Sequence, residues 1–114
     1  MLEIVIEEGD DYTLCRPVGE LDAYTVGQFR EALGGLADKP KLLIDLSDVP
    51  FMDSAGLGAL IGGIRRARDA DGDVVVASSR ATLTRLLHTT GFDRIVPVTD
   101  SVEAAVAAFG TTPD

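Results

Sequence analysis

Ser54 is the residue of this sequence whose type and setting best suit covalent chemistry. It follows Asp53 directly and precedes four glycines within eight positions, in the stretch MDSAGLGALIGG at residues 52–63. If Asp53 is the N-cap of a helix, Ser54 is the first helical residue and its hydroxyl is not used for capping. Unpaired amides and the positive end of the helix dipole would then favour an anion such as a phosphate on Ser54. A serine is also a common structural choice at a helix start, so both interpretations stand at this point.

The glycines behind Ser54 need an explanation, because each costs about 1 kcal/mol relative to alanine inside a helix. At about 100° per residue, the large apolar side chains fall on one side of this helix and the small residues on the other. The large residues, expected to face a sheet, are Leu57, Leu60, Ile61 and Ile64, and the small ones are Ala55, Gly58, Ala59 and Gly62. The small residues predict a bare strip that a partner can approach closely, or one that packs against the protein's own loops.

The elements that must position Ser54 follow from hydrophobic periodicity. Alternating apolar and polar residues predict strands, three- and four-residue spacing predicts helices, and clusters of Gly, Asp and Pro predict turns. Strands are expected at residues 2–8, 12–19, 41–46, 73–78 and 94–98, and helices at 25–38, from 54 onward, at 79–91 and at 100–110. The order β-β-α-β-α-β-α-β-α predicts an α/β fold, with an N-terminal hairpin, a mixed and mainly parallel sheet, and helices packed on it.

Local signals predict how several of these elements begin and end. The glycine-rich helix is expected to start with a hydrophobic staple between Met52 and Leu57, and Gly91 is expected to end the next helix. Pro17 indicates an edge or a bulge near the end of the second strand. The other expectations are a capping box of Thr25 with Gln28, a staple of Tyr24 with Phe29, a cap at Asp100 with Glu103, and burial of Val102, Val106 and Phe109.

Composition limits the classes of function. The chain has 114 residues, 46% of them hydrophobic and 25% charged, which suits one globular domain. A formal net charge of −9 argues against nucleic acid and anionic membranes as partners. The single cysteine, Cys15, allows neither an internal disulfide nor a cysteine-based zinc site. The N-terminal residues do not resemble a signal peptide and no apolar stretch is long enough to span a membrane, so a cytoplasmic protein is expected.

Other residues with chemical potential have plainer explanations. His88, the single histidine, is expected to be solvated or to interact with a helix C-terminus, because no G-x-S-x-G motif accompanies it. Four aspartates near predicted strand ends suggest a magnesium site or a polar loop surface: Asp22, Asp45, Asp48 and Asp53. A receiver-type magnesium site would need a lysine after the last strand, and the two lysines, Lys39 and Lys41, lie no later than the start of the third strand. A polar loop surface is therefore favoured.

The remaining motifs do not indicate an enzyme. A basic cluster of Arg65, Arg66 and Arg68 is expected to be a solvated face or a contribution to docking. The sequence contains no P-loop and no G-x-G-x-x-G motif, so no dedicated nucleotide site is indicated. We therefore expect a binding protein without a catalytic residue, a metal or a cofactor.

Most of the chain resembles one family. The stretches at residues 19–33, 42–63 and 82–109 are similar to the STAS domain of bacterial anti-sigma factor antagonists, and D-S-x-G-L-G at residues 53–58 is the most specific motif. The resemblance implies a single STAS domain over residues 1–110, followed by a short polar tail at 111–114. It also implies the fold expected above.

The family implies a phosphorylation switch. An unmodified antagonist binds an anti-sigma factor that is also a serine kinase of the histidine-kinase-like ATPase fold, and the sigma factor is released. The kinase then phosphorylates the motif serine, the antagonist dissociates, and a serine phosphatase restores the active form. Ser54 matches the phosphorylated serine, Asp53 the preceding acid, and Asp22 an acid near the site. Ala55 occupies a position that is often Ser or Thr in the family, which leaves Ser54 as the phosphoacceptor.

The resemblance and the helix faces together predict a docking surface. Its expected members are Asp22, Tyr24, Thr25, Asp53, Ser54, Ala55, Gly56, Gly58, Ala59 and Gly62. A phosphate adds about −1.5 to −2 charge beside Asp53, and a loss of roughly 3 kcal/mol of binding would weaken affinity more than a hundredfold. Two alternatives remain: a constitutive STAS subunit of a lipid-transport ATPase complex, without phospho-regulation, and a scaffold subunit of a stress-sensing assembly.

Overall fold

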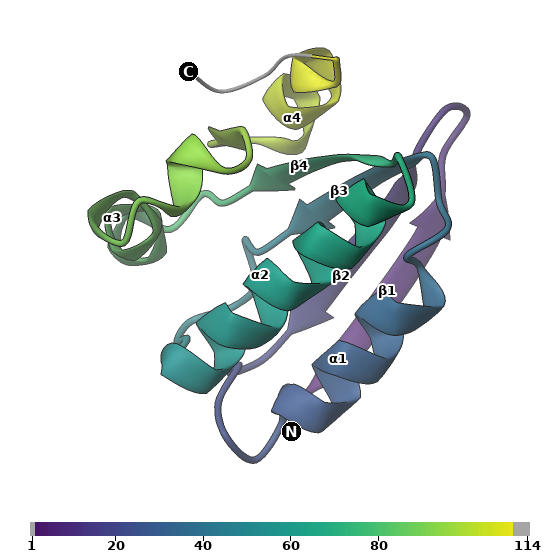
Figure 1. Ribbon diagram of the computed structural model, residues 1–114. Helices are drawn as coiled ribbons and strands as arrows, with labels where there is room; N and C mark the ends of the chain where they lie inside the picture. Colours follow the sequence, from purple (N-terminus) through teal and green to yellow (C-terminus); the bar gives the residue numbers. More distant parts are fainter. Residues whose placement is uncertain (1, 111–114) are drawn as a thin grey trace.

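A five-stranded sheet forms the centre of the protein in the computed structural model, which describes residues 2–110 (Figure 1). The strands are β1 (Glu3–Glu8), β2 (Thr13–Val18), β3 (Lys41–Asp45), β4 (Asp73–Ala77) and β5 (Val98–Thr99), and they lie in chain order. The helices are α1 (Val26–Gly35), α2 (Ser54–Asp69), α3 (Ala81–Thr89) and α4 (Val102–Ala108). β1 and β2 pair antiparallel and the other neighbours pair parallel. The predicted α/β order, hairpin and mainly parallel sheet are confirmed.

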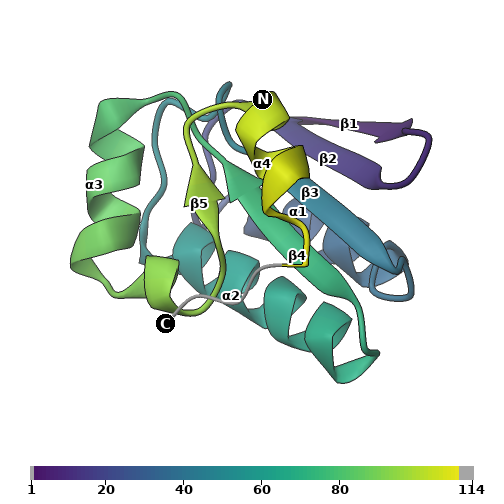
Figure 2. The same ribbon diagram turned by 90° about the horizontal axis from the view of Figure 1, so that it is seen from above.

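Helices cover the two faces of the sheet unequally. α1 and α2 lie side by side on one face, where Phe29, Leu60 and Ile64 belong to the larger hydrophobic core (Figure 1). α4 lies on the other face, where Ala105 packs with Leu43 and other sheet residues in a smaller core (Figure 2). The first turn of α2 lies beyond the carboxyl end of β3, the place where parallel sheets usually carry their sites.

Pro17 lies where the second strand has a neighbour on one side. The pairing of β2 with β3 runs from Thr13 to Cys15, whereas Pro17 faces Ile4 of β1 alone. A residue without an amide hydrogen fits this position because no strand on the other side requires a donor. The predicted edge is confirmed, and the one-to-one register with β1 contains no bulge.

The predicted start of α1 is wrong in its details. Thr25 is the N-cap residue, but its hydroxyl turns back into the preceding loop and donates to the carbonyl of Glu20 at 2.8 Å. The side-chain Nε2 of Gln28 donates to the carbonyl of Leu2 at 3.1 Å instead of facing Thr25, so no capping box forms. Tyr24 is 98% exposed whereas Phe29 is buried, so these two side chains form no staple.

The C-terminal elements also differ from the expectation. Gly91, at φ 79°, ends α3 as predicted and leads into a 3-10 turn at Phe92–Arg94. Of the strand predicted at residues 94–98, only Val98 therefore lies in a strand, β5. Ser101 caps α4 in place of Asp100, with its hydroxyl accepting from the amide of Ala104 at 3.1 Å. The predicted burial of three residues in or next to α4 is wrong: Val106 is 37% exposed and Val102 and Phe109 are half-buried, because Ala105 is the α4 residue that is fully buried against the sheet. Residues 111–114 of the predicted tail lie outside the described residues.

Candidate phosphorylation and docking site

Two loops are joined by backbone hydrogen bonds at the start of α2. Leu21, after β2, forms a parallel bridge with Met52, before α2. The amide of Leu21 donates to the carbonyl of Phe51 at 3.0 Å, and the amide of Asp53 donates to the carbonyl of Leu21 at 3.1 Å. Leu21 is fully buried, so the bridge is anchored in the core. The loop before α1 is therefore held against the first turn of α2.

Both carboxylate oxygens of Asp53 are used at this junction. Oδ1 accepts a hydrogen bond from the amide of Gly56 at 2.9 Å, which confirms Asp53 as the N-cap of α2. Oδ2 accepts from the amide of Ala23 at 3.2 Å, in the loop before α1. One side chain thus fixes the helix start and the neighbouring loop in a single arrangement.

Ser54 is exposed at the N-terminus of α2. It is the first residue of α2, and its hydroxyl has no hydrogen bond with any residue in the described part of the chain. The amides of Ser54 and Ala55 likewise have no acceptor among the described residues, because they precede the first helical hydrogen bond, from Leu57 to Asp53 at 2.9 Å. The hydroxyl is accessible, and the nearby amides are suited to hold an oxyanion.

Asp22 shapes the loop on the other side of the junction. Its Oδ1 accepts from the amides of Tyr24 at 2.9 Å and Thr25 at 3.1 Å. This local turn leaves the ring of Tyr24 98% exposed. A hollow of about 500 Å³ next to it is lined by Gly19, Glu20, Asp22, Tyr24, Thr25 and Pro50.

The small residues of α2 do not all lie on the exposed strip predicted for them. Gly56 is buried, and a Cβ there would stand 2.5 Å from the carbonyl oxygen of Leu21. Ala59 is 2% exposed and faces the core. The predicted exposure of these two residues is wrong, because Gly56 packs against Leu21 of the loop before α1 and Ala59 lies on the core side of α2. Gly58 and Gly62 do stand over open space and keep the bare strip predicted for them.

Gly63 allows the close approach of α1 and α2. A Cβ at Gly63 would lie 2.5 Å from Cδ1 of Leu33 in α1. The helical glycines therefore serve two purposes: Gly56 and Gly63 allow close packing inside the protein, and Gly58 and Gly62 leave the outside bare. Leu57 and Ile61, predicted to face the sheet, are half-buried beside this outer strip.

Phe51 is a candidate docking residue that the sequence analysis missed. Its side chain is 52% exposed, one residue before the buried Met52. An apolar groove of about 180 Å³ is lined by Pro50, Phe51, Met52, Thr82, Leu83 and Leu86. The sequence feature that could have revealed this residue is an isolated aromatic side chain between Pro50 and Met52, in the loop before α2.

The other candidate residues are separated from this junction by their contacts. Cys15 is completely buried, and burial raises the pKa of its thiol to about 11, so it is a core residue. His88 is exposed and its Nδ1 lies 2.7 Å from a carboxylate oxygen of Asp93. Asp48 forms an ion pair with Arg16 at 2.8 Å. Among residues 2–110, no group of three or more His, Cys, Asp or Glu is arranged to hold a metal ion.

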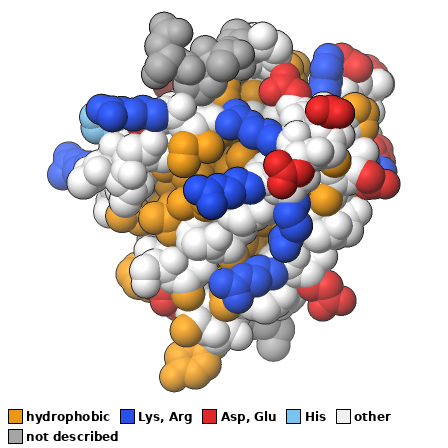
Figure 3. Space-filling model, viewed as in Figure 1, with side chains coloured by type: hydrophobic (Ala, Val, Ile, Leu, Met, Phe, Trp, Pro, Cys, Tyr) orange, Lys and Arg blue, Asp and Glu red, His pale blue; other side chains and the backbone are white. Residues whose placement is uncertain are grey.

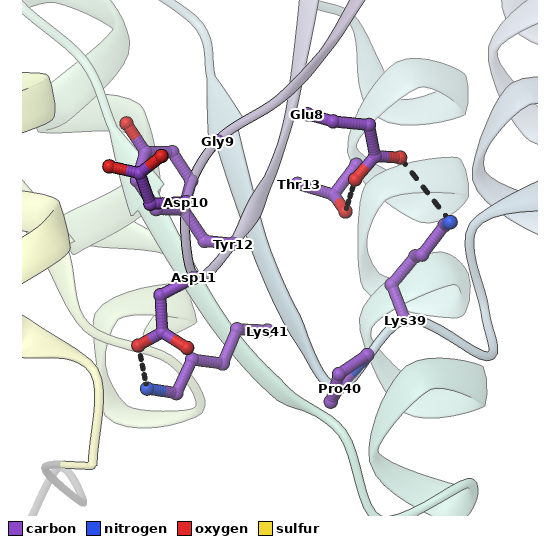
Figure 4. Close-up of a pocket in the computed structure, with 9 residues that line it drawn as sticks. All are labelled: Glu8, Gly9, Asp10, Asp11, Tyr12, Thr13, Lys39, Pro40 and Lys41. Atoms are coloured by element: carbon purple, nitrogen blue, oxygen red, sulfur yellow. Dashed lines mark hydrogen bonds and ion pairs between the residues drawn. The ribbon is translucent and has the colours of Figure 1, made fainter.

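A second hollow, of about 310 Å³, lies at the amino ends of the parallel strands, away from Ser54 (Figure 4). Both of its lysines are paired with carboxylates: Lys39 lies 3.3 Å from Glu8, and Lys41 lies 2.7 Å from Asp11. The hydroxyl of Thr13 donates to Glu8 at 2.9 Å, and this bond, with Lys39, lowers the pKa of that carboxyl. A ligand would have to break these pairs. The stronger candidate is therefore the place where the loop before α1 is held against the first turn of α2, here called the Ser54 junction.

Comparison with known proteins gives the family. The STAS domain matches residues 3–105. The chain belongs to the STAS domain family. An anti-sigma-B factor antagonist of Listeria monocytogenes is 34% identical over 100 residues, which cover 85% of this chain and 88% of that protein. The anti-sigma-B factor antagonist of Bacillus subtilis is 28% identical, with 92% and 97% covered.

Solved structures agree with this assignment. An anti-sigma factor antagonist from Mycobacterium paratuberculosis superposes on this STAS domain with a TM-score of 0.87, at 27% identity, over 95% of this chain and 93% of the other. These relatives are named as antagonists of regulatory factors and not as enzymes. In the described part of this STAS domain, no helix has the length and apolar character needed to cross a membrane.

Proposed function

We propose that this STAS domain is an anti-sigma factor antagonist that phosphorylation of Ser54 switches off. The observation that carries the proposal is the exposed, unbonded Ser54 hydroxyl at the first position of α2, beside an Asp53 that fixes two loops at once. The relatives with the same family domain are named for antagonism of anti-sigma factors. In this role the protein is a substrate of a serine kinase and a phosphatase, not itself an enzyme, and it acts in the cytoplasm.

The unmodified protein binds an anti-sigma factor serine kinase of the histidine-kinase-like ATPase fold, which frees the sigma factor. Asp22, Asp53 and Ser54 form the polar centre of the docking surface. Tyr24 and Phe51 supply exposed aromatic area, and such side chains often dominate binding energy. The other members of the docking surface are Thr25, Ala55, Gly58 and Gly62. Direct binding of nucleic acid or membrane has no part in this function.

Electrostatics supplies the switch. A phosphate on Ser54 would stand beside Asp53 and near the Asp22 loop, on a chain whose formal net charge is −9. The free amides of Ser54 and Ala55 hold the phosphate in the unbound protein, so no refolding is required. In the complex the phosphate must lose water beside carboxylates that cannot pair with it, and a loss of roughly 3 kcal/mol gives more than a hundredfold weaker binding.

The test is a capture experiment from the native host with three baits. Wild type and Ser54→Ala retain an ATPase-fold anti-sigma factor, and Ser54→Asp loses it. Phosphorylation of the wild-type bait by the captured protein and ATP, abolished in Ser54→Ala, then assigns the modified residue. A transporter ATPase held equally by all three baits would instead identify a constitutive subunit of a lipid-transport complex.

A further inference from the structure

The exposed face of α2 continues from Ser54 along the whole helix. Leu57, Ile61, Arg65 and Arg68 follow Ser54 at steps of three or four residues, so they share one face, here called the α2 ridge. Leu57 and Ile61 are half-buried, and Gly58 and Gly62 leave space beside them. The α2 ridge is therefore apolar and flanked by small residues near Ser54, and it is basic near the end of the helix.

The arginines of the α2 ridge have no acidic partner among residues 2–110. Both lysines are paired with carboxylates, and Arg16 is paired with Asp48. Neither Arg65 nor Arg68 forms an ion pair with any residue between 2 and 110, which is also true of the other arginines except Arg16. The two α2 arginines differ from the others in following the apolar residues Leu57 and Ile61 on one helix face. Figure 3 shows Lys and Arg side chains gathered over the face that carries α1 and α2, with hydrophobic atoms visible between them. Two unpaired positive charges on a strongly acidic chain are free to meet an acidic partner.

We infer that the α2 ridge is a second docking contact, on which the partner places an apolar segment against Leu57 and Ile61 and carboxylates against Arg65 and Arg68. The inference rests on the proposed function, and it adds the chemistry of the partner's surface. The 11 helical steps from Ser54 to Arg65 span about 16 Å, a length that a single protein interface covers easily. The Ser54 junction then acts as the switch, and the α2 ridge contributes partner selection and association rate.

The chemistry of the α2 ridge favours a protein over other anionic partners. The basic patch is short, and Asp69 follows it directly in α2. Nucleic acid and anionic membranes are attracted by long basic stripes or a positive net charge, and this chain has a formal net charge of −9. The adjacent apolar residues suit a side chain of a folded partner. An acidic, partly apolar helix or loop of the anti-sigma factor matches both halves of the α2 ridge.

The test measures affinity for a single partner, the anti-sigma factor retained by the Ser54→Ala bait, purified and titrated calorimetrically. The variant is Arg65→Glu with Arg68→Glu. The matched control is Arg85→Glu with Arg94→Glu, which makes the same change in net charge at two exposed arginines in α3 and the following 3-10 turn. Circular dichroism and denaturation establish that each variant is folded. Each titration is run at about 0.15 M and at about 0.5 M salt.

The expected result is a loss of at least tenfold in affinity for the α2 variant at the lower salt, a smaller loss at the higher salt, and a change of less than threefold for the control. Equal losses in both variants would mean that net charge alone matters, and would overturn the inference. Unchanged binding of the α2 variant, while Ser54→Asp still abolishes binding, would overturn the inference and leave the proposed function standing. If no ATPase-fold anti-sigma factor is retained, the proposed function fails, and the inference fails with it.

Discussion

Asp53 accepts a hydrogen bond from the amide of Ala23 at 3.2 Å, a contact between residues 30 positions apart. The other oxygen of the same carboxylate caps α2 at Gly56. Through these two bonds, the loop that carries Asp22 and the helix that begins with Ser54 form one rigid surface. A partner that binds this surface therefore contacts both segments in a fixed arrangement, and a change at Ser54 affects its contacts with both.

Replacement of Asp53 separates its two roles. Asp53→Ala removes the cap and the bridge and is expected to lower the free energy of unfolding by about 1–2 kcal/mol. Asp53→Asn keeps one acceptor oxygen for Gly56 but leaves the second contact to Ala23 without an oxygen. Urea denaturation measures the first effect, and amide hydrogen exchange at Ala23 measures the second.

Ser101→Ala is the control for this pair, because Ser101 caps α4 by the same kind of hydrogen bond. It should destabilise the protein by a similar amount without faster exchange at Ala23. Slow exchange at Ala23 in both Asp53 variants would contradict the role of Asp53 as a bridge.

The glycines of α2 should respond to alanine in opposite directions. Gly56→Ala places a methyl group 2.5 Å from the carbonyl oxygen of Leu21, so the bridge to Met52 must shift, at an expected cost of several kcal/mol of stability. Gly58→Ala meets open space and should stabilise the protein by about 0.5–1 kcal/mol through helix propensity. Chemical denaturation measures both. Equal effects at the two positions would disprove the division into packing and surface glycines.

The exposed aromatic residues should matter for binding and not for folding. Tyr24→Ala and Phe51→Ala remove exposed rings, so their unfolding free energy should change by less than about 1 kcal/mol. Affinity for the anti-sigma factor should fall tenfold or more if the rings anchor the interface, since aromatic anchors often contribute about 2 kcal/mol or more. Ile6→Ala is the control, because Ile6 is 47% exposed on β1, at the far edge of the sheet from α3 and its groove. An equal loss of binding in the control would remove the special role of the two rings.

Cys15 should make stability fall at high pH. Burial raises the pKa of its thiol from 9.0 to about 11, so the unfolded chain loses the proton first as pH rises. Below pH 9 the thiol is protonated in both the folded and the unfolded state, so it does not make stability depend on pH. Between pH 9 and pH 11 the free energy of unfolding decreases, by at most about 1.4 kcal/mol per pH unit. Denaturation of wild type and Cys15→Ala across this range isolates the effect from that of other groups. Parallel pH profiles for the two proteins would contradict this account.

The sequence predicted the features that depend on local chemistry. The element order, the cap at Asp53 and the left-handed end of α3 at Gly91 each follow from a few neighbouring residues. The exposure of Gly56 and Ala59 was wrong because it depends on where the loop at Leu21 and helix α1 pack, which the periodicity of α2 does not encode. The cap at Asp100 failed because Ser101, one residue on, offered an equally suitable oxygen.

The candidate site was predictable in part. The position of Ser54 follows from the cap, whereas the hydrogen bond from Ala23 to Asp53 joins distant segments and could not be read from spacing. Tyr24 was predicted in two roles, as a staple and as a docking residue, and its 98% exposure excludes the first. Phe51 was missed because an aromatic residue in a loop is usually buried, and its exposure depends on the path of the chain between β3 and α2.

Phosphate on Ser54 should abolish partner binding, and a single calorimetric titration measures this effect. The protein is phosphorylated stoichiometrically at Ser54 and compared with the unmodified protein in calorimetric binding to the purified anti-sigma factor. We expect at least a hundredfold weaker binding after phosphorylation, with the circular dichroism spectrum unchanged. Equal affinity of the two forms would contradict the account, and Ser54 would then be an ordinary first residue of a helix.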